Sequence, residues 1–268
     1  MFFIYLMIGA LSGTMAGLLG LGGGIVVVPA LAIAYAHNPL IPTEDIMHMA
    51  VGTSLAVITV TFLSSLHAHM KKKSVRLDIV KKFVPGLVVG VIAGALISNH
   101  LPSAFLRVFF SLFLLFIASR LFRGELAVPN ATLPGMPVII GATMVIGALS
   151  SILGAGGGII LIPFMVRSQI DMRQATGTSV ACGVVIGLTA TLCFMLLGRD
   201  VVPDLPWTSG FIYWPAFFGV ALTSILFAPI GTAVAYRLPI ITLKRILAVF
   251  IVIVAIQMLF PILHKMLG

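Results

Sequence analysis

The sequence predicts an all-α polytopic membrane protein with two inverted repeats, each a glycine-broken helical hairpin plus three transmembrane helices. Of the 268 residues, 60% are hydrophobic and only 9% are charged, whereas soluble domains carry about 25% charged residues. The apolar residues form runs near the length of about 20 residues that a membrane helix needs. These runs lack the alternation of an outer-membrane barrel. A soluble globule and a barrel are therefore excluded.

The first predicted repeat covers residues 1–123 and begins with a hairpin at 2–36. Glycines interrupt this stretch, and the apolar run after them is too short to cross a hydrocarbon core of about 30 Å at about 1.5 Å per residue. We therefore expect the chain to turn inside the membrane there. Three full-length spans are expected next, at 46–66, 79–97 and 104–121.

The second predicted repeat covers residues 137–268 and has the same order of elements. A polar stretch, 124–136, precedes it and is expected to be a cytoplasmic loop. The hairpin at 137–166 contains the second glycine cluster. Spans are expected at 175–197, 211–236 and 240–263. One long kinked span in each half is the alternative to the two re-entrant hairpins.

Matching sequence blocks show that the two halves are repeats. Leu-Gly-Leu-Gly-Gly-Gly-Ile at 19–25 matches Leu-Gly-Ala-Gly-Gly-Gly-Ile at 153–159, and Ala-Val-Gly-Thr-Ser-Leu-Ala at 50–56 matches Ala-Thr-Gly-Thr-Ser-Val-Ala at 175–181. The blocks keep the same order in both halves. Internal repeats of this kind are a common plan of secondary transporters.

The basic residues set the predicted orientation, because cytoplasmic loops carry an excess of Lys and Arg. Placing the basic loop at 71–82 in the cytoplasm puts all 16 basic residues on that side except Arg107, Arg199 and Lys265. Both termini then lie outside, and the equivalent spans at 46–66 and 175–197 run in opposite directions. The net charge of +9 reflects this topology, so we expect the lipid bilayer, and no nucleic acid, as a partner.

The two glycine clusters are the first candidate substrate site. Its residues are Gly22, Gly23, Gly24, Gly156, Gly157 and Gly158. Each cluster precedes a short helix, whose first N–H groups lack intrahelical partners and carry the positive end of the helix dipole. Two inverted hairpins would direct two such ends at one point and so form an anion site. The alternative role of the glycines is close helix packing.

The paired Gly-Thr-Ser blocks supply the remaining candidates, Thr53, Ser54, Thr178 and Ser179. Their hydroxyl groups can donate to an anion without the cost of burying a charge. The alternative is that they bond to the backbone or across helices, as Ser and Thr in membrane helices often do.

The titratable residues indicate no catalytic or metal site. All seven acidic residues fall at loops or span ends, whereas a carboxylate at the midplane would suggest a cation site or a proton relay. His48 lies one turn before Gly52 and could titrate near the site, but we interpret it as an interfacial histidine. Cys182 and Cys193 are interpreted as packing residues. We therefore expect no cofactor, no metal and no proton carrier in the protein.

The paired Gly-x-Gly-Gly-Gly-…-Pro blocks, the paired Gly-Thr-Ser blocks and the length of the chain resemble the sulfite exporter TauE/SafE family of bacterial membrane transporters. The resemblance covers nearly the whole chain. It implies export of small sulfur-containing anions such as sulfite, sulfoacetate or related organosulfonates across the bacterial inner membrane. It also implies that the glycine and Thr-Ser residues named above match the family's motifs.

The sequence therefore predicts a secondary transporter for a small anion, held by glycine-cluster amides and by Thr and Ser hydroxyls, with alternating access. An anion channel would share this site, and a transporter of another small anion is also open. An intramembrane enzyme ranks last, because neither a Gly-x-Ser-x-Gly motif nor clustered acidic ligands occur. Whether the chain forms a homodimer is left open.

Overall fold

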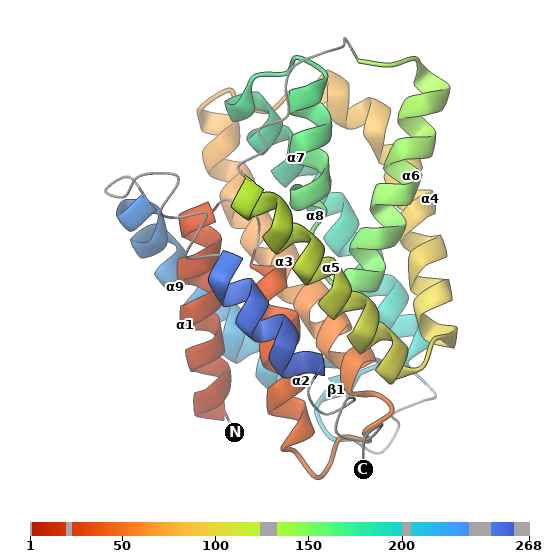
Figure 1. The fold of residues 1–268 in the computed structure, drawn as a ribbon, viewed down its shortest axis with the longest axis vertical. Coiled ribbons are helices and arrows are strands. Elements are labelled where there is room, and N and C mark those ends of the chain that lie inside the picture. Colours follow the sequence, from red (N-terminus) through yellow and green to blue (C-terminus); the bar gives the residue numbers. More distant parts are fainter. Residues whose placement is uncertain (1, 20–22, 124–132, 200–204, 236–247, 260–268) are drawn as a thin grey trace.

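The protein is almost entirely helical, as the predicted class requires (Figure 1). The computed structural model describes residues 2–19, 23–123, 133–199, 205–235 and 248–259. The helices in chain order are α1 (Phe2–Leu19), α2 (Gly24–Ala36), α3 (Ile46–Lys71), α4 (Leu77–His100), α5 (Ser103–Arg123), α6 (Met136–Leu153), α7 (Gly158–Arg167), α8 (Met172–Leu197), α9 (Trp214–Ala235) and a last helix, Ala248–Leu259. This confirms the all-α polytopic membrane fold.

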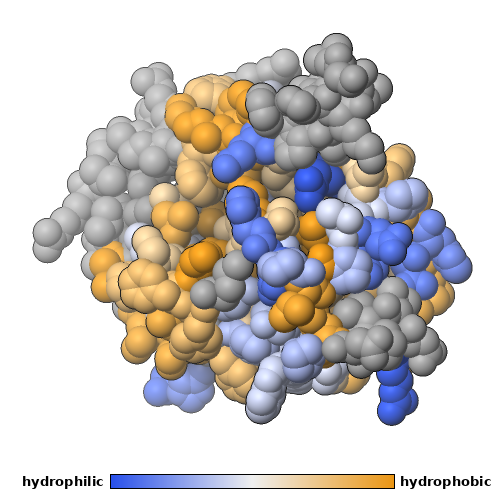
Figure 2. Space-filling view, turned by 90° about the horizontal axis from the view of Figure 1, so that it is seen from below, coloured by the Kyte–Doolittle hydropathy of each residue, from blue (hydrophilic) through white to orange (hydrophobic). Residues whose placement is uncertain are grey.

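Five of the described helices are long and apolar enough to cross a membrane by length and composition: Ile46–Lys71, Leu77–His100, Ser103–Arg120, Met136–Leu153 and Met172–Leu197. Large apolar side chains on the outside of the bundle are exposed, among them Leu192 and Leu196. Figure 2 views the lower end, where hydrophilic residues gather in the middle and hydrophobic residues make up much of the surrounding surface. A polar end with apolar sides is the surface of a multi-pass membrane protein.

The two glycine clusters break two helical hairpins that open toward opposite ends of the molecule (Figure 1). Helix α1 rises from the lower end and α2 returns to it, whereas α6 descends from the upper end and α7 returns there. Gly154 and Gly157 have φ angles of 63° and 74°. Glycine is the residue that adopts this left-handed region without steric cost, so the second break needs glycine at both positions.

The hairpins exchange partners between the two halves of the chain. Helix α1 packs on α9, and α6 packs on α4. A methyl group on Gly9 of α1 would clash with Thr223 Oγ1 of α9, and one on Gly86 of α4 would clash with Thr143 Oγ1 of α6. Each interface thus packs one threonine against one glycine. The glycine is on the hairpin helix α1 in the first pair and on the partner helix α4 in the second. The inverted repeats and their boundaries remain a prediction, and the pairing of α1 with α9 and of α6 with α4 is what two such repeats would produce.

Helix α9 begins at Trp214, three residues after the expected start of the span at 211–236. Two short strands, β1 (Thr208–Ser209) and β2 (Ile212–Tyr213), pair antiparallel there and hold the preceding residues in a hairpin. Several expected features fall outside the described residues: Gly22, most of the loop at 124–136, both ends of the span at 240–263, and the two termini.

Candidate functional site

The two helix breaks meet inside the protein. Gly24, the first residue of α2, is buried, and a methyl group added to it would lie 2.6 Å from the Gly154 carbonyl oxygen and 3.1 Å from Ala155 Cα. The two backbones are therefore in direct contact. Ser54 of α3 joins them, because its hydroxyl donates to the Gly154 carbonyl oxygen at 3.0 Å. The structure thus brings Gly24, Ser54 and the second glycine cluster together.

Each short helix starts with amide groups bonded to the glycine before it. In α2, the N–H groups of Val26 and Val27 donate to the Gly23 carbonyl at 2.9 and 3.0 Å. In α7, those of Ile160 and Leu161 donate to the Gly157 carbonyl at 3.1 and 2.9 Å. The first two N–H groups of each helix, at residues 24 and 25 of α2 and 158 and 159 of α7, have no i−4 partner within the helix. They stand at the positive end of the helix dipole. Both breaks therefore present backbone donors suited to an anion.

A small cavity of about 10 Å³ lies beside the second break. Phe113 of α5, Ser150 of α6 and the segment 155–160 line it. A volume of about 10–15 Å³ holds roughly one water molecule. An oxyanion with three or four oxygen atoms would therefore need the surrounding helices to move before it could reach these amides.

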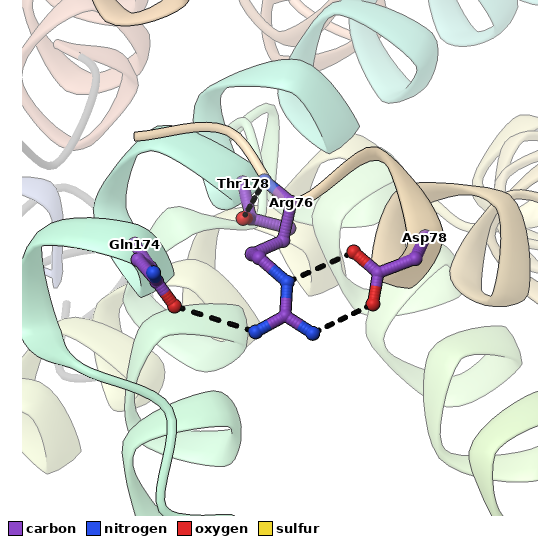
Figure 3. Close-up of polar contacts among 4 residues, drawn as sticks. All are labelled: Arg76, Asp78, Gln174 and Thr178. Atoms are coloured by element: carbon purple, nitrogen blue, oxygen red, sulfur yellow. Dashed lines mark hydrogen bonds and ion pairs between the residues drawn. The ribbon is translucent and has the colours of Figure 1, made fainter. Parts of the chain in front are cut away.

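The two threonines of the Gly-Thr-Ser blocks hold the starts of two long helices. Arg76 precedes α4, and its backbone N–H donates to Thr178 Oγ1 of α8 at 3.0 Å (Figure 3). Tyr213 precedes α9, and its backbone N–H donates to Thr53 Oγ1 of α3 at 3.1 Å. Both threonines are fully buried. Each hydroxyl oxygen accepts its bond, so a hydroxyl hydrogen remains for another acceptor.

The side chain of Arg76 forms a surface ion pair with Asp78 (Figure 3). Its Nε and Nη2 donate to the two carboxylate oxygens at 2.9 and 2.7 Å, and Nη1 lies 3.5 Å from Gln174 Oε1. The two paired side chains are 45% and 54% exposed, and exposed pairs of this kind contribute about 0–1 kcal/mol. The part-buried backbone bond to the buried Thr178 hydroxyl therefore does more than the ion pair to fix α4 on α8.

Replacing Thr178 with valine is expected to destabilise the fold. The variant keeps the shape of the side chain but leaves the part-buried Arg76 N–H without its acceptor, and a hydrogen bond contributes about 0.5–1.5 kcal/mol to stability. Thermal unfolding in detergent measures the loss. Thr176→Val is the control, since the Thr176 hydroxyl is exposed and bonds only to the Met172 carbonyl of its own helix. Equal melting temperatures for the two variants would show that the hydrogen bond from the Arg76 N–H to Thr178 does not stabilise the fold.

Ser179, the counterpart of Ser54, is also buried on α8, at 2% exposure. The hydroxyl groups of Thr53 and Thr178 serve helix starts, while that of Ser54 contacts a glycine break directly. Of the expected site residues, Gly23, Gly24, Gly156, Gly157, Gly158 and Ser54 thus lie at the breaks. Gly22 falls outside the described residues.

Phe62 is a site residue that the sequence does not single out. Its ring lies against the second break, because methyl groups on Gly156 of that break and on Gly183 of α8 would both collide with it. Phe62 forms a separate apolar cluster with Ile58, Val180 and Val184. It lies two turns beyond Ser54 on α3, toward the end of that helix that carries the basic loop. This cluster, the Phe62 plug, covers the second break from that end.

Three tyrosines form a second group near Thr53. The rings of Tyr5, Tyr35 and Tyr213 pack edge to face with centroids 6.0 to 6.3 Å apart, and Tyr35 donates to Thr53 Oγ1 at 3.2 Å. Within the described chain, the buried Tyr5 hydroxyl has no hydrogen-bond partner. The sequence gives only one indication of this group: tyrosine is scarce, with four in the chain, and three of them gather here.

The aspartates that precede α3 and α8 differ in whether their side chains cap the helix. Asp171 accepts a hydrogen bond from the Arg173 N–H and so caps α8, whereas the Asp45 side chain makes no such bond at the start of α3. His48 is buried against its neighbours at 6% exposure, and its place at the membrane interface stays a prediction. In the described part of the chain, no three His, Cys, Asp or Glu side chains group together as metal ligands would.

Comparison with known proteins agrees with this architecture. The family model described as "Sulfite exporter TauE/SafE" matches residues 5–258. A probable membrane transporter protein of Haemophilus influenzae is 31% identical over 94% of this chain and 96% of its own length. The probable membrane transporter protein YunE of Bacillus subtilis is 27% identical over 97% of both chains. No solved structure matches the chain. With a family model that covers almost its whole length, the chain belongs to the sulfite exporter TauE/SafE family of membrane transporters.

Proposed function

We propose that this transporter exports a small sulfur-containing anion, such as sulfite, sulfoacetate or another organosulfonate, across the bacterial inner membrane by alternating access. The observation that supports this most directly is the contact of Gly24 with Gly154 and Ala155, which joins the start of α2 to the break between α6 and α7. In transporters built of inverted repeats, substrate sites lie at such discontinuous helices near the midplane.

The chemistry of the breaks suits an anion held without a charged side chain. Backbone N–H groups and the positive ends of α2 and α7 supply donors and potential. The Ser54 hydroxyl adds a directed donor once it leaves the Gly154 carbonyl. Sulfite and sulfonate groups carry three oxygen atoms that accept hydrogen bonds from several directions, which matches a site made of dispersed donors.

The tightness of the site supports movement between two states. A cavity of about 10 Å³ beside the second break is too small for an oxyanion, and the Phe62 ring packs against Gly156 of that break. The interfaces α1–α9 and α4–α6 each join one helix from either half of the chain. Shifting these two packed pairs against each other would open the breaks to one side at a time. Energy would come from exchange or from a proton gradient.

An anion channel remains the alternative function, since it would use the same donors. A transporter shows saturable flux and counterflow, in which unlabelled anion on one side drives labelled anion inward against its gradient. A channel shows neither. Purified protein in liposomes, tested with labelled sulfite, sulfoacetate and thiosulfate, distinguishes the two and also ranks the anions.

Gly24 and Gly141 provide a matched test of the site. A methyl group on Gly24 would press on the Gly154 carbonyl at 2.6 Å and the Ile58 side chain at 2.5 Å, whereas one on Gly141 of α6, away from the breaks, meets nothing within 4 Å. Overpacking costs about 1–3 kcal/mol, and about 1.4 kcal/mol corresponds to a tenfold change in affinity. We expect Gly24→Ala to lower flux at limiting anion roughly tenfold and Gly141→Ala to leave it near the unmodified level.

Both variants must first elute as single species in detergent, so that loss of flux is not loss of protein. Equal flux from folded Gly24→Ala and unmodified protein would place the anion elsewhere. Absence of flux from the unmodified protein with every tested anion would contradict the proposed substrate class.

A further inference from the structure

His48 occupies a buried position where elements from both halves of the chain meet. It lies in the first turn of α3 and is 6% exposed. Its ring stacks on that of Phe211, with centroids 5.2 Å apart and planes 26° apart. Phe211 belongs to the strand hairpin that leads into α9. The ring therefore joins a helix of the first half to the segment that starts a helix of the second half.

The hydrogen bond of His48 fixes which ring nitrogen carries the hydrogen. Nε2 lies 2.9 Å from the backbone carbonyl oxygen of Ser98, near the end of α4. A carbonyl oxygen only accepts, so Nε2 must be the N–H donor, and Nδ1 of the neutral ring then carries a bare lone pair. In the described structure Nδ1 is buried without a hydrogen-bond partner, and so is the Ser98 hydroxyl oxygen. A buried polar group without a partner is destabilising, because it has lost its hydrogen bonds to water.

A carboxylate stands close enough to act on this ring. Asp45 precedes α3 and is 7% exposed. Burial raises the pKa of the Asp45 carboxyl, the charge of His48 lowers it, and Glu44 raises it. Among the described residues, the neighbouring elements at this end also carry His37 after α2, His100 on α4, Arg107 on α5 and Arg199 after α8. Of these, only Arg107 is partly buried, and the other three are exposed.

We propose that His48 is a proton-binding site of the transporter, with Nδ1 as the atom that takes the proton and Asp45 as the balancing charge. One proton from water adds to the Nδ1 lone pair and gives an imidazolium ion with two N–H donors. No other bond changes, and release returns the same proton to water. The proposal deepens the proposed transport function and rests on it for the role of the proton, though not for its binding.

Charging this ring would change the contact between the two halves of the chain. An imidazolium over the face of Phe211 gains a cation–π attraction that the neutral ring lacks. The new N–H also removes the unpaired acceptor and can donate to an oxygen. Protonation therefore favours the packed arrangement of α3 against the strand hairpin, and deprotonation weakens it. A proton bound on one side of the membrane would thus bias which way the site opens.

The binding of the proton is tested by titration of the full-length protein. Nuclear magnetic resonance of protein labelled on its six histidines, in detergent micelles, follows each ring between about pH 5 and 8. We expect one titrating signal to disappear in His48→Gln and to remain in His100→Gln, which changes an exposed histidine two residues after Ser98. If the His48 signal keeps one protonation form throughout this range, the proposal is wrong.

Coupling is tested with anions of fixed charge, sulfoacetate and thiosulfate, so that protonation of the substrate plays no part. In proteoliposomes, His48→Gln should retain counterflow within about twofold but lose accumulation driven by a pH gradient by about tenfold or more, a usual size for coupling between sites. His100→Gln should behave like the unmodified protein. His48→Asn is the second variant if His48→Gln does not fold.

The two proposals fail in different ways. Undiminished pH-driven accumulation by folded His48→Gln would overturn the coupling role of His48 and leave the transport function standing. No flux of either anion in the unmodified protein would count against the transport function, while the histidine titration would still decide whether His48 binds the proton.

Discussion

A Gly90→Leu variant is expected to give little folded protein. Gly90 of α4 faces the backbone of α6, where an added methyl group would lie 2.7 Å from the Met144 carbonyl carbon and 2.8 Å from its Cα, and would clash with the carbonyl oxygen. Backbone atoms cannot rotate away as a side chain can, so the two helices must separate. Small residues permit this close approach in membrane helices. We expect a cost at the upper end of the overpacking range, about 3 kcal/mol or more.

Gly141→Leu on α6 is the matched control for this prediction. A methyl group there meets nothing within 4 Å, so the added side chain points into open space. Size-exclusion profiles and thermal unfolding in detergent compare the two variants. A monodisperse Gly90→Leu protein with the melting temperature of Gly141→Leu would show that α4 and α6 do not pack as closely as described.

A Phe62→Ala variant is expected to lose both stability and control of transport. Phe62 is 4% exposed and packs with Ile58, Val180 and Val184 against the second glycine break. Truncating a buried Phe to Ala costs about 3–5 kcal/mol, through lost burial and the cavity that remains. The cavity would also adjoin Gly156 and open the break toward the end with the basic loop. We therefore expect a lower melting temperature and an anion leak that does not saturate.

Two variants separate the plug from a general packing effect. Phe62→Leu refills most of the space and should restore saturable flux. Phe116→Ala removes a ring that is 56% exposed on α5 and should change neither stability nor flux appreciably. Saturable, unmodified flux from Phe62→Ala would exclude Phe62 as a barrier and leave it a packing residue.

The sequence predicts the features that depend on local composition and on repetition. Hydrophobic runs of membrane length predicted the helices, and two identical Gly-Gly-Gly triplets predicted where the hairpins break. The Gly-Thr-Ser pairs were found in the same way. The hydrogen-bond partners of these Thr and Ser hydroxyl groups could not be predicted, because a hydroxyl in a membrane helix has many acceptors within reach. The structure assigns Thr53 and Thr178 to helix starts and Ser54 to a glycine break.

The features that sequence reasoning missed all depend on contacts between distant segments. The Phe62 ring packs against Gly156 and Gly183, which lie 94 and 121 residues further along the chain. His48 contacts Ser98 and Phe211, which lie 50 and 163 residues further along the chain and could not be paired with it from the sequence. The short strands before α9 shorten an apolar run that alone looks like uninterrupted helix.

The sequence by itself determined that this chain is a polytopic helical transporter with two glycine-broken hairpins, because lipid demands long apolar helices and only glycine permits the breaks. The tertiary structure alone decided that the breaks touch, that Phe62 covers one of them, and that His48 is buried with one nitrogen unpaired. Apolar patterning fixes which residues avoid water, whereas the close approach of two backbones depends on how whole helices pack against each other.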